Sequence, residues 1–171
     1  MKKLFLLAFA MVTLGVMNLY AQLDAADWER AKAFTMEYLE AMPADKYDFK
    51  PTPEIRSFAE QMLHLTDANY GFTAAIMGMQ PKYEQGYHEK MEDKSKAKVM
   101  EAVGAGYDYV IDAVKKANAA QMGEMITLFG RFEVSRGKAF EKAFEHQTHH
   151  RGQTTAYLRL AGVTPPPEKL F

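Results

Sequence analysis

Residues 135–162 read SRGKAFEKAFEHQTHHRGQTTAYLRLAG, an amphipathic stretch without proline that carries three of the five histidines of the chain. Its apolar residues recur at about 100° per residue, which is the helical period. We predict a helix from about Ser135 to Leu160, with Gly162 as its C-cap and the prolines at 165–167 ending it. The residues expected to face inward are Phe140, Phe144, Thr154, Leu158 and Ala161.

Three segments upstream of this helix have the same period, at about 24–42, 57–78 and 94–117. The second of them opens at a capping box, Ser57-Phe58-Ala59-Glu60. Proline breaks helix interiors, and none lies between residues 82 and 164. No segment has good β-branched alternation, so we expect no strand. Four helices of this length predict an all-α fold, a four-helix bundle.

The composition limits the classes of function. The chain has 171 residues, a formal net charge of −1 and no cysteine. This length suits one compact domain. Without cysteine there can be no disulfide, thiolate metal site, cysteine nucleophile or lipid-modified N-terminal cysteine. The near-neutral charge argues against nucleic-acid binding. Any transition-metal chemistry would therefore have to use histidine.

The N-terminal residues 1–21, MKKLFLLAFAMVTLGVMNLYA, have the features of a cleaved signal peptide. Two lysines precede an uncharged apolar stretch, and the small Ala21 offers a cleavage point before Gln22. The alternative is an uncleaved membrane anchor. The apolar stretch at 4–19 is 16 residues long, however, and a spanning helix needs about 20. We therefore expect a signal peptide at 1–21, a bundle domain at 22–171 without a stable membrane anchor, and export to the periplasm.

Histidine spacing predicts a metal site. His146 and His150 are four residues apart, so they stack on one helix face about 40° apart and can share one ion. On their helical wheels both flank the apolar stripe, and so does His64 on its own helix. Two flanking faces can meet in a groove, which allows a site formed by His64, His146 and His150. Zinc or nickel suits three imidazoles and would keep open positions.

Other interpretations of the histidines stay open at this point. His64 could be an ordinary structural histidine, and the pair at 146 and 150 could be a chance spacing on an exposed face. His149 points away from the core but competes with His150 as a partner of His146. His88 lies in a polar linker at 80–93, where we expect no special role.

Supporting residues are harder to assign. Arg151 falls toward the core on the helical wheel. It could anchor a carboxylate such as Glu60 behind the metal, bind an anionic substrate, or form a buried ion pair that sets the helix packing. Gln153 could donate to a ligand or cap a polar edge. No general base is identifiable. Its candidates are Glu60, Asp67 and Glu145.

Several motifs together resemble a known family. They are HQTHHRGQ at 146–153, YLR at 157–159, YDFKP at 47–51 and RSFAE at 56–60. In this combination, spread over the whole mature chain, they are similar to the DinB/YfiT-like family of metalloenzymes. The resemblance implies a four-helix bundle with three histidine ligands, one from the second helix and two from the last. These correspond to His64, His146 and His150.

The resemblance leaves the reaction open. Related proteins include S-transferases and isomerases that act on low-molecular-weight thiols, where the metal would present a thiolate. Such thiols are expected in the cytoplasm, so an exported member favours a hydrolase-like reaction in which the metal activates water on a small-molecule substrate. The rival interpretations are thiol S-transfer, and a non-catalytic bundle with a vestigial site. The sequence also leaves homodimerisation open.

Overall fold

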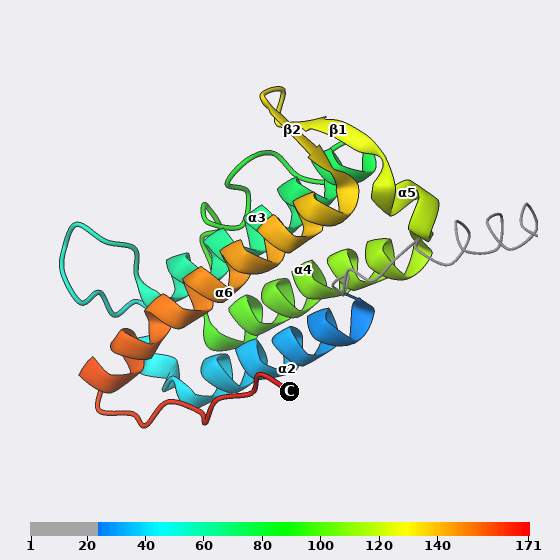
Figure 1. The fold of residues 1–171 in the computed structure, drawn as a ribbon. Helices are drawn as coiled ribbons and strands as arrows, with labels where there is room; N and C mark the ends of the chain where they lie inside the picture. Colours follow the sequence, from blue (N-terminus) through cyan, green and yellow to red (C-terminus); the bar gives the residue numbers. More distant parts are fainter. Residues whose placement is uncertain (1–23) are drawn as a thin grey trace, which may run out of the picture.

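The computed structural model describes residues 24–171 and confirms the predicted helical bundle (Figure 1). Its four long helices are α2 (Ala25–Ala41), α3 (Phe58–Met77), α4 (Lys96–Lys116) and α6 (Arg136–Leu160). A short 3₁₀ helix, η1 (Ala44–Lys46), follows α2, and a five-residue helix, α5 (Ala119–Gly123), follows α4. Among the described residues, no helix is long and apolar enough to cross a bilayer. The predicted signal peptide at 1–21 lies outside them.

The helix ends follow local chemistry, which is why the sequence located them closely. Asp24 forms a capping box with Asp27 at the start of α2. The predicted capping box of α3 is present, because Ser57 accepts from the Glu60 amide and the Glu60 side chain accepts from the Ser57 amide. Gly78 ends α3 in the left-handed region at φ 66°, where a residue without a Cβ is favoured.

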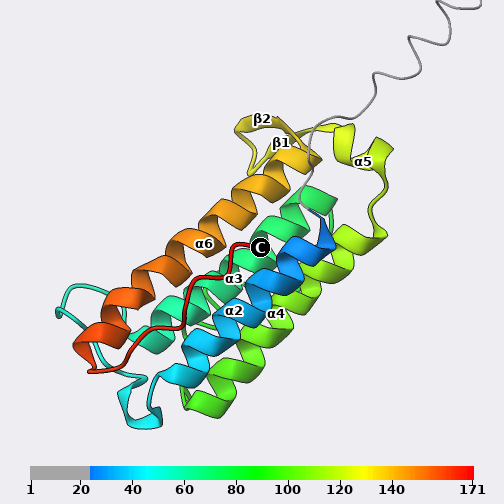
Figure 2. The same cartoon turned by 60° about the horizontal axis from the view of Figure 1, so that its bottom comes forward.

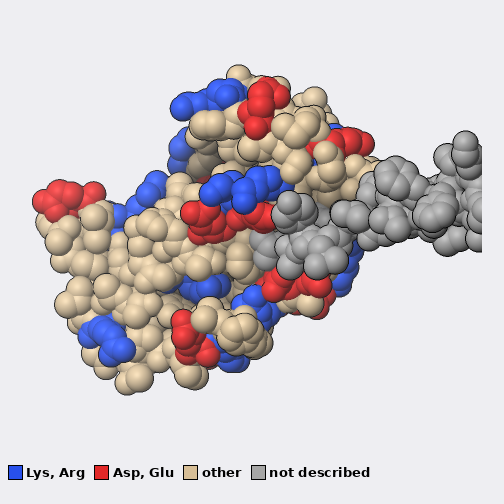
Figure 3. Space-filling model, in the orientation of Figure 1, with Lys and Arg blue, Asp and Glu red and all other residues tan. Residues whose placement is uncertain are grey.

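The core lies between α3 and its neighbours α4 and α6, with α2 packed on α4 and α6 from the other side. Its largest fully buried side chains include Trp28, Phe58, Tyr107 and Phe140. After α6 the chain returns along α2 (Figure 2), where the Arg30 guanidinium donates to the Lys169 carbonyl at 3.0 Å. On the face in Figure 3, basic and acidic side chains are interspersed rather than separated by sign.

A polar network inside the bundle joins three helices. The Tyr107 hydroxyl of α4 donates to Gln147 Oε1 of α6 at 2.7 Å and lies 2.7 Å from the Thr35 hydroxyl of α2. Arg151, one turn further along α6, also donates to Gln147 Oε1, at 3.1 Å. All four side chains are buried. Because unpaired buried polar groups are costly, this network sets how α6 is turned about its axis.

The expectation of no strand is wrong between α5 and α6. There, β1 (Met125–Leu128) and β2 (Phe132–Ser135) form an antiparallel hairpin that pairs Leu128 with Phe132. Each strand has only four residues, which is too short for alternation to stand out. The turn places Phe129 at φ 53° and Gly130 at φ 71°, both left-handed, as tight hairpin turns require.

Two glycines of α4, Gly104 and Gly106, differ in how closely α3 approaches them. A Cβ on Gly106 would lie 3.0 Å from Cγ2 of the buried Thr66 on α3, whereas a Cβ on Gly104 would meet nothing within 4 Å. Thr66 cannot easily yield, since its hydroxyl donates to the Met62 carbonyl at 3.0 Å. We expect Gly104→Ala to raise the free energy of unfolding by about 0.5–1 kcal/mol through helix propensity.

Gly106→Ala should instead lower the free energy of unfolding, ending about 1–3 kcal/mol below the Gly104→Ala variant because of overpacking. Urea denaturation followed by circular dichroism measures both values. Equal stabilisation by the two substitutions would contradict the close approach of α3 and α4.

Candidate metal centre

Three imidazoles from two helices converge at one point. His64 comes from α3, and His146 and His150 come from successive turns of α6. One ring nitrogen of each lies within 4.8 Å of the others, and the ring centroids are 4.3 to 5.5 Å apart. All three side chains are partly buried. The three histidines singled out in the sequence therefore lie together, while His149 on the same helix is exposed.

The site favours uncharged imidazole. Burial, and after it the electrostatic effect of the neighbouring His64 and His149, lowers the pKa of His146 to about 4. Burial and the neighbouring His146 and His64 lower the pKa of His150 to about 3. Two of the three rings are thus neutral near pH 7, and a neutral imidazole has the free lone pair that a metal ion needs.

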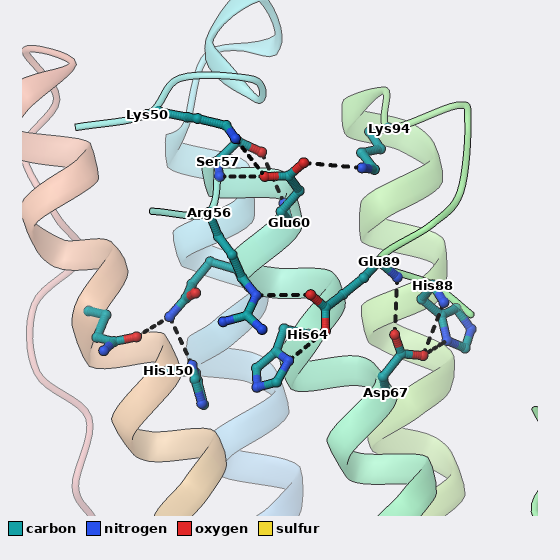
Figure 4. Close-up of polar contacts among 12 residues, drawn as sticks. Lys50, Arg56, Ser57, Glu60, His64, Asp67, His88, Glu89, Lys94 and His150 are labelled. Carbon is teal, nitrogen blue, oxygen red and sulfur yellow. Dashed lines mark hydrogen bonds and ion pairs between the residues drawn. The ribbon is translucent and has the colours of Figure 1, made fainter. Parts of the chain in front are cut away.

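His64 is oriented by a carboxylate that sequence reasoning missed. Its Nδ1 lies 2.6 Å from Glu89 Oε1, and the other oxygen of Glu89 accepts from Arg56 Nε at 2.9 Å (Figure 4). A histidine whose Nδ1 is bound to a carboxylate presents Nε2 to the opposite side. This carboxylate–histidine pairing is the usual way in which metal-ligating histidines are held.

Glu89 is itself held in place by Asp67 of α3. The Asp67 carboxylate accepts from the amides of His88 and Glu89, each at 3.0 Å, and lies 2.6 Å from His88 Nδ1. Burial alone would raise the pKa of Asp67, but these hydrogen bonds together lower it. His88, for which the sequence suggested no role, is 5% exposed and stacks on Tyr70. The polar linker is thereby tied to α3 beside His64.

A second support reaches His150 from α3. Nε2 of the buried Gln61 lies 2.8 Å from His150 Nδ1, and the same amide donates to Gln153 Oε1. Gln153 Nε2 in turn lies 3.0 Å from His149 Nε2. Gln153 thus acts on the site through Gln61. If the side-chain amide of Gln61 is flipped, its oxygen takes the place of its nitrogen. Gln61 can then accept a hydrogen bond from a protonated Nδ1 of His150.

Arg151 does not anchor Glu60 behind the histidines, which was one of the three roles considered for it. Arg151 is one residue past His150, about 100° around α6, and so faces Tyr107 and Gln147 rather than the histidines. Its guanidinium lies 4.6 Å from the Phe34 ring centroid, and no carboxylate pairs with it among residues 24–171. Burial lowers the pKa of Arg151.

Glu60 belongs to the α3 N-terminus instead. It bonds the Ser57 amide and forms ion pairs with Lys50 and Lys94, and the Ser57 hydrogen bond is the main cause that lowers its pKa to about 2. Glu145 is also elsewhere, in an exposed ion pair with Lys142. Neither of these general-base candidates contacts the three histidines.

A divalent cation fits this donor set. The Nδ1 atom of His146 is buried and has no hydrogen-bond partner among the described residues. Three closely spaced imidazoles, two of them with a supported Nδ1, are typical of zinc and nickel sites. His64 and Glu89 also line a cavity of about 840 Å³, which runs along α3 beneath the linker. A ligand in this cavity would therefore lie against His64, the one of the three histidines that lines it.

Comparisons with known proteins agree with the fold of the bundle. Two crystal structures have similar folds, both DinB-like proteins. That from Bacillus cereus has a TM-score of 0.72 at 17% identity over 83% of this chain and 93% of its own. That from Bacillus subtilis has a TM-score of 0.67 at 21% identity over 84% and 94%. Curated proteins gave no significant match.

The family comparison is the more specific result. The model of the DinB family matches residues 17–170, nearly the whole chain. This match covers all four long helices and the three convergent histidines, which together fit a metal-binding protein. The chain with this bundle and this histidine centre therefore belongs to the DinB family.

Proposed function

We propose that this protein is an exported, metal-dependent enzyme of hydrolase type. His64, His146 and His150 would hold one divalent cation, zinc or nickel. The observation that carries the proposal is the convergence of three imidazoles, one of which, His64, lines a cavity large enough for a small molecule. Export rests on the signal-like sequence at residues 1–21 alone.

The surrounding residues would keep the ligands ready to bind. Glu89 holds the Nδ1 side of His64, so this ring offers Nε2 directly. Gln61 holds the Nδ1 side of His150, which offers Nε2 once the Gln61 amide presents its oxygen to a protonated Nδ1. A divalent cation held by these three ligands would have an open coordination position. There it would lower the pKa of a bound water or polarise a carbonyl group. Arg56 neutralises Glu89, which favours this carboxylate as an orienting group over a base.

Hydrolysis is preferred to thiol transfer because water needs no diffusible thiol outside the cytoplasm. A metal-binding module without catalysis remains the second outcome that the experiments below distinguish.

Metal content is the first test. After dialysis against zinc or nickel and then metal-free buffer, the wild-type protein should retain about one ion per chain. His150→Ala should retain almost none, because two imidazoles hold an ion weakly. The matched control is His149→Ala, which removes an exposed neighbouring histidine and should retain the ion. Inductively coupled plasma mass spectrometry gives the stoichiometry.

Activity is tested next, on the same three proteins after incubation with the metal. Wild-type and His149→Ala proteins should hydrolyse at least one member of a panel of esters and amides, and His150→Ala should be inactive. A wild-type protein that binds neither metal would overturn the proposal. Metal-loaded protein that turns over only thiol acceptors would replace hydrolysis with S-transfer, and one that turns over nothing would favour the non-catalytic module.

The support from Glu89 gives a separate prediction. Glu89→Gln keeps the size of the side chain but removes the charge that orients His64. We expect it to weaken zinc affinity by about 10- to 100-fold. Glu92→Gln, on the same linker but exposed and outside the lining of the cavity, should change affinity less than twofold. Competition with a chromogenic chelator measures both affinities. Equal zinc affinities of the two variants would contradict the role of Glu89 in orienting His64.

A further inference from the structure

The cavity beside the histidines has an open, apolar floor on α3. Small residues lie along this floor, at Ala68, Gly71 and Ala75. They are not required by a close backbone contact, because a Cβ built on Gly71 meets nothing within 4 Å. The space above them is therefore free for a ligand rather than filled by a packed element.

The walls of the cavity come from two separate connections. One wall is the linker at 81–90, and the other is Phe129 at the tip of the hairpin. Phe72 joins the cavity to the metal centre, because its ring centroid lies 5.0 Å from that of Phe129 and 5.6 Å from that of His146. An apolar group packed on Phe72 would thus be separated from His146 by one ring.

The linker wall is held in a defined position. Asp67 binds the amides of His88 and Glu89, and the Tyr70 ring packs on both Tyr83 and His88. A wall held by these contacts gives a largely preformed pocket, which is typical of small-molecule sites.

The shape and charge of the cavity limit what fits. The lining residues of α3 run from His64 to Ala75, about 16 Å along the helix axis at 1.5 Å per residue. The inner carboxylates are already bound, Glu89 by Arg56 and Asp67 by His88. At the far end, the Lys82 ammonium lies 5.4 Å from the Tyr83 ring centroid, in a cation–π contact. The linker also contributes Glu84 and Lys90 to the lining. Apart from His64 and Asp67, the α3 side of the cavity is uncharged, and Ala68, Gly71, Phe72 and Ala75 make it largely apolar.

We propose that this cavity binds an uncharged alkyl or aryl-alkyl chain of the substrate, with the reactive carbonyl at His64 and the chain packed on Phe72 and Phe129. The substrate class would be esters or amides of apolar acids. This inference rests on the proposed function for the placement of the reactive group. The binding of the chain itself can be tested separately.

The test of chain length uses hydroxamic acids on zinc-loaded protein. The hydroxamate group binds the metal, and the chain is lengthened from acetohydroxamic through butanohydroxamic to octanohydroxamic acid. Affinity measured by calorimetry should increase about three- to fourfold for each methylene that enters the cavity. If all three bind with equal affinity, the metal site stands but the chain pocket is overturned.

A second measurement needs no metal. 4-Phenylbutan-1-ol added to the metal-free protein should shift the methyl resonance of Met79, which lines the cavity. The matched internal control is Met36, which lies in a groove between α2 and α4 and should not shift. This measurement shows whether an apolar chain binds in the cavity, even if no metal binds and the proposed function fails. An unchanged Met79 resonance at millimolar ligand would overturn the inference.

Variants locate the bound chain. Ala75→Trp fills the floor, so octanohydroxamic acid should lose its advantage while acetohydroxamic acid keeps its affinity. Ala33→Trp makes the same change on the exposed face of α2 and should behave like the wild type. Phe129→Asn keeps a residue that accepts positive φ and removes the ring, so it should weaken only the long ligand, by about tenfold. The Phe129→Asn variant tests the inference even if Ala75→Trp does not fold. Unchanged binding of octanohydroxamic acid to Phe129→Asn would overturn the inference.

Discussion

The buried hydrogen bonds of Gln147 determine how α6 is turned, and the metal centre depends on that rotation. Gln147 is fully buried and accepts from both Tyr107 and Arg151. Rotating α6 would leave these polar groups without partners in the core, at a cost of about 1–3 kcal/mol for each. With this side of α6 facing α2 and α4, His146 and His150 have to face α3, where His64 lies.

The same constraint explains why the adjacent residues His150 and Arg151 on α6 have different roles. Arg151 follows His150 directly, yet it stabilises the packing of the bundle and contacts the Phe34 ring instead of the histidines. Opposite them, α3 supplies both a ligand, His64, and the support of another, Gln61. The close approach of α3 and α4 at Gly106 holds α3 in this position.

Much of the fold could be predicted from the sequence because helix ends are local. The ranges expected for α3 and α6 match the structure to within a residue or two, since Ser57, Gly78 and Ser135 act on their own neighbours. The hairpin was missed because its strands are four residues long. The alternatives for Arg151 could not be resolved from the sequence, because a helical wheel shows which side a residue faces but not what the next helix presents there.

From the residue pattern came the four helices, the helix faces of His64, His146 and His150 and the absence of thiolate ligands. Periodicity and residue type are properties of one segment, so they can be seen without the rest of the chain. Tertiary structure alone decided that Glu89 meets His64 across 25 residues, that Gln61 meets His150 across 89, and that a cavity opens beside them. These contacts depend on how helices and linker pack together, which no local pattern encodes.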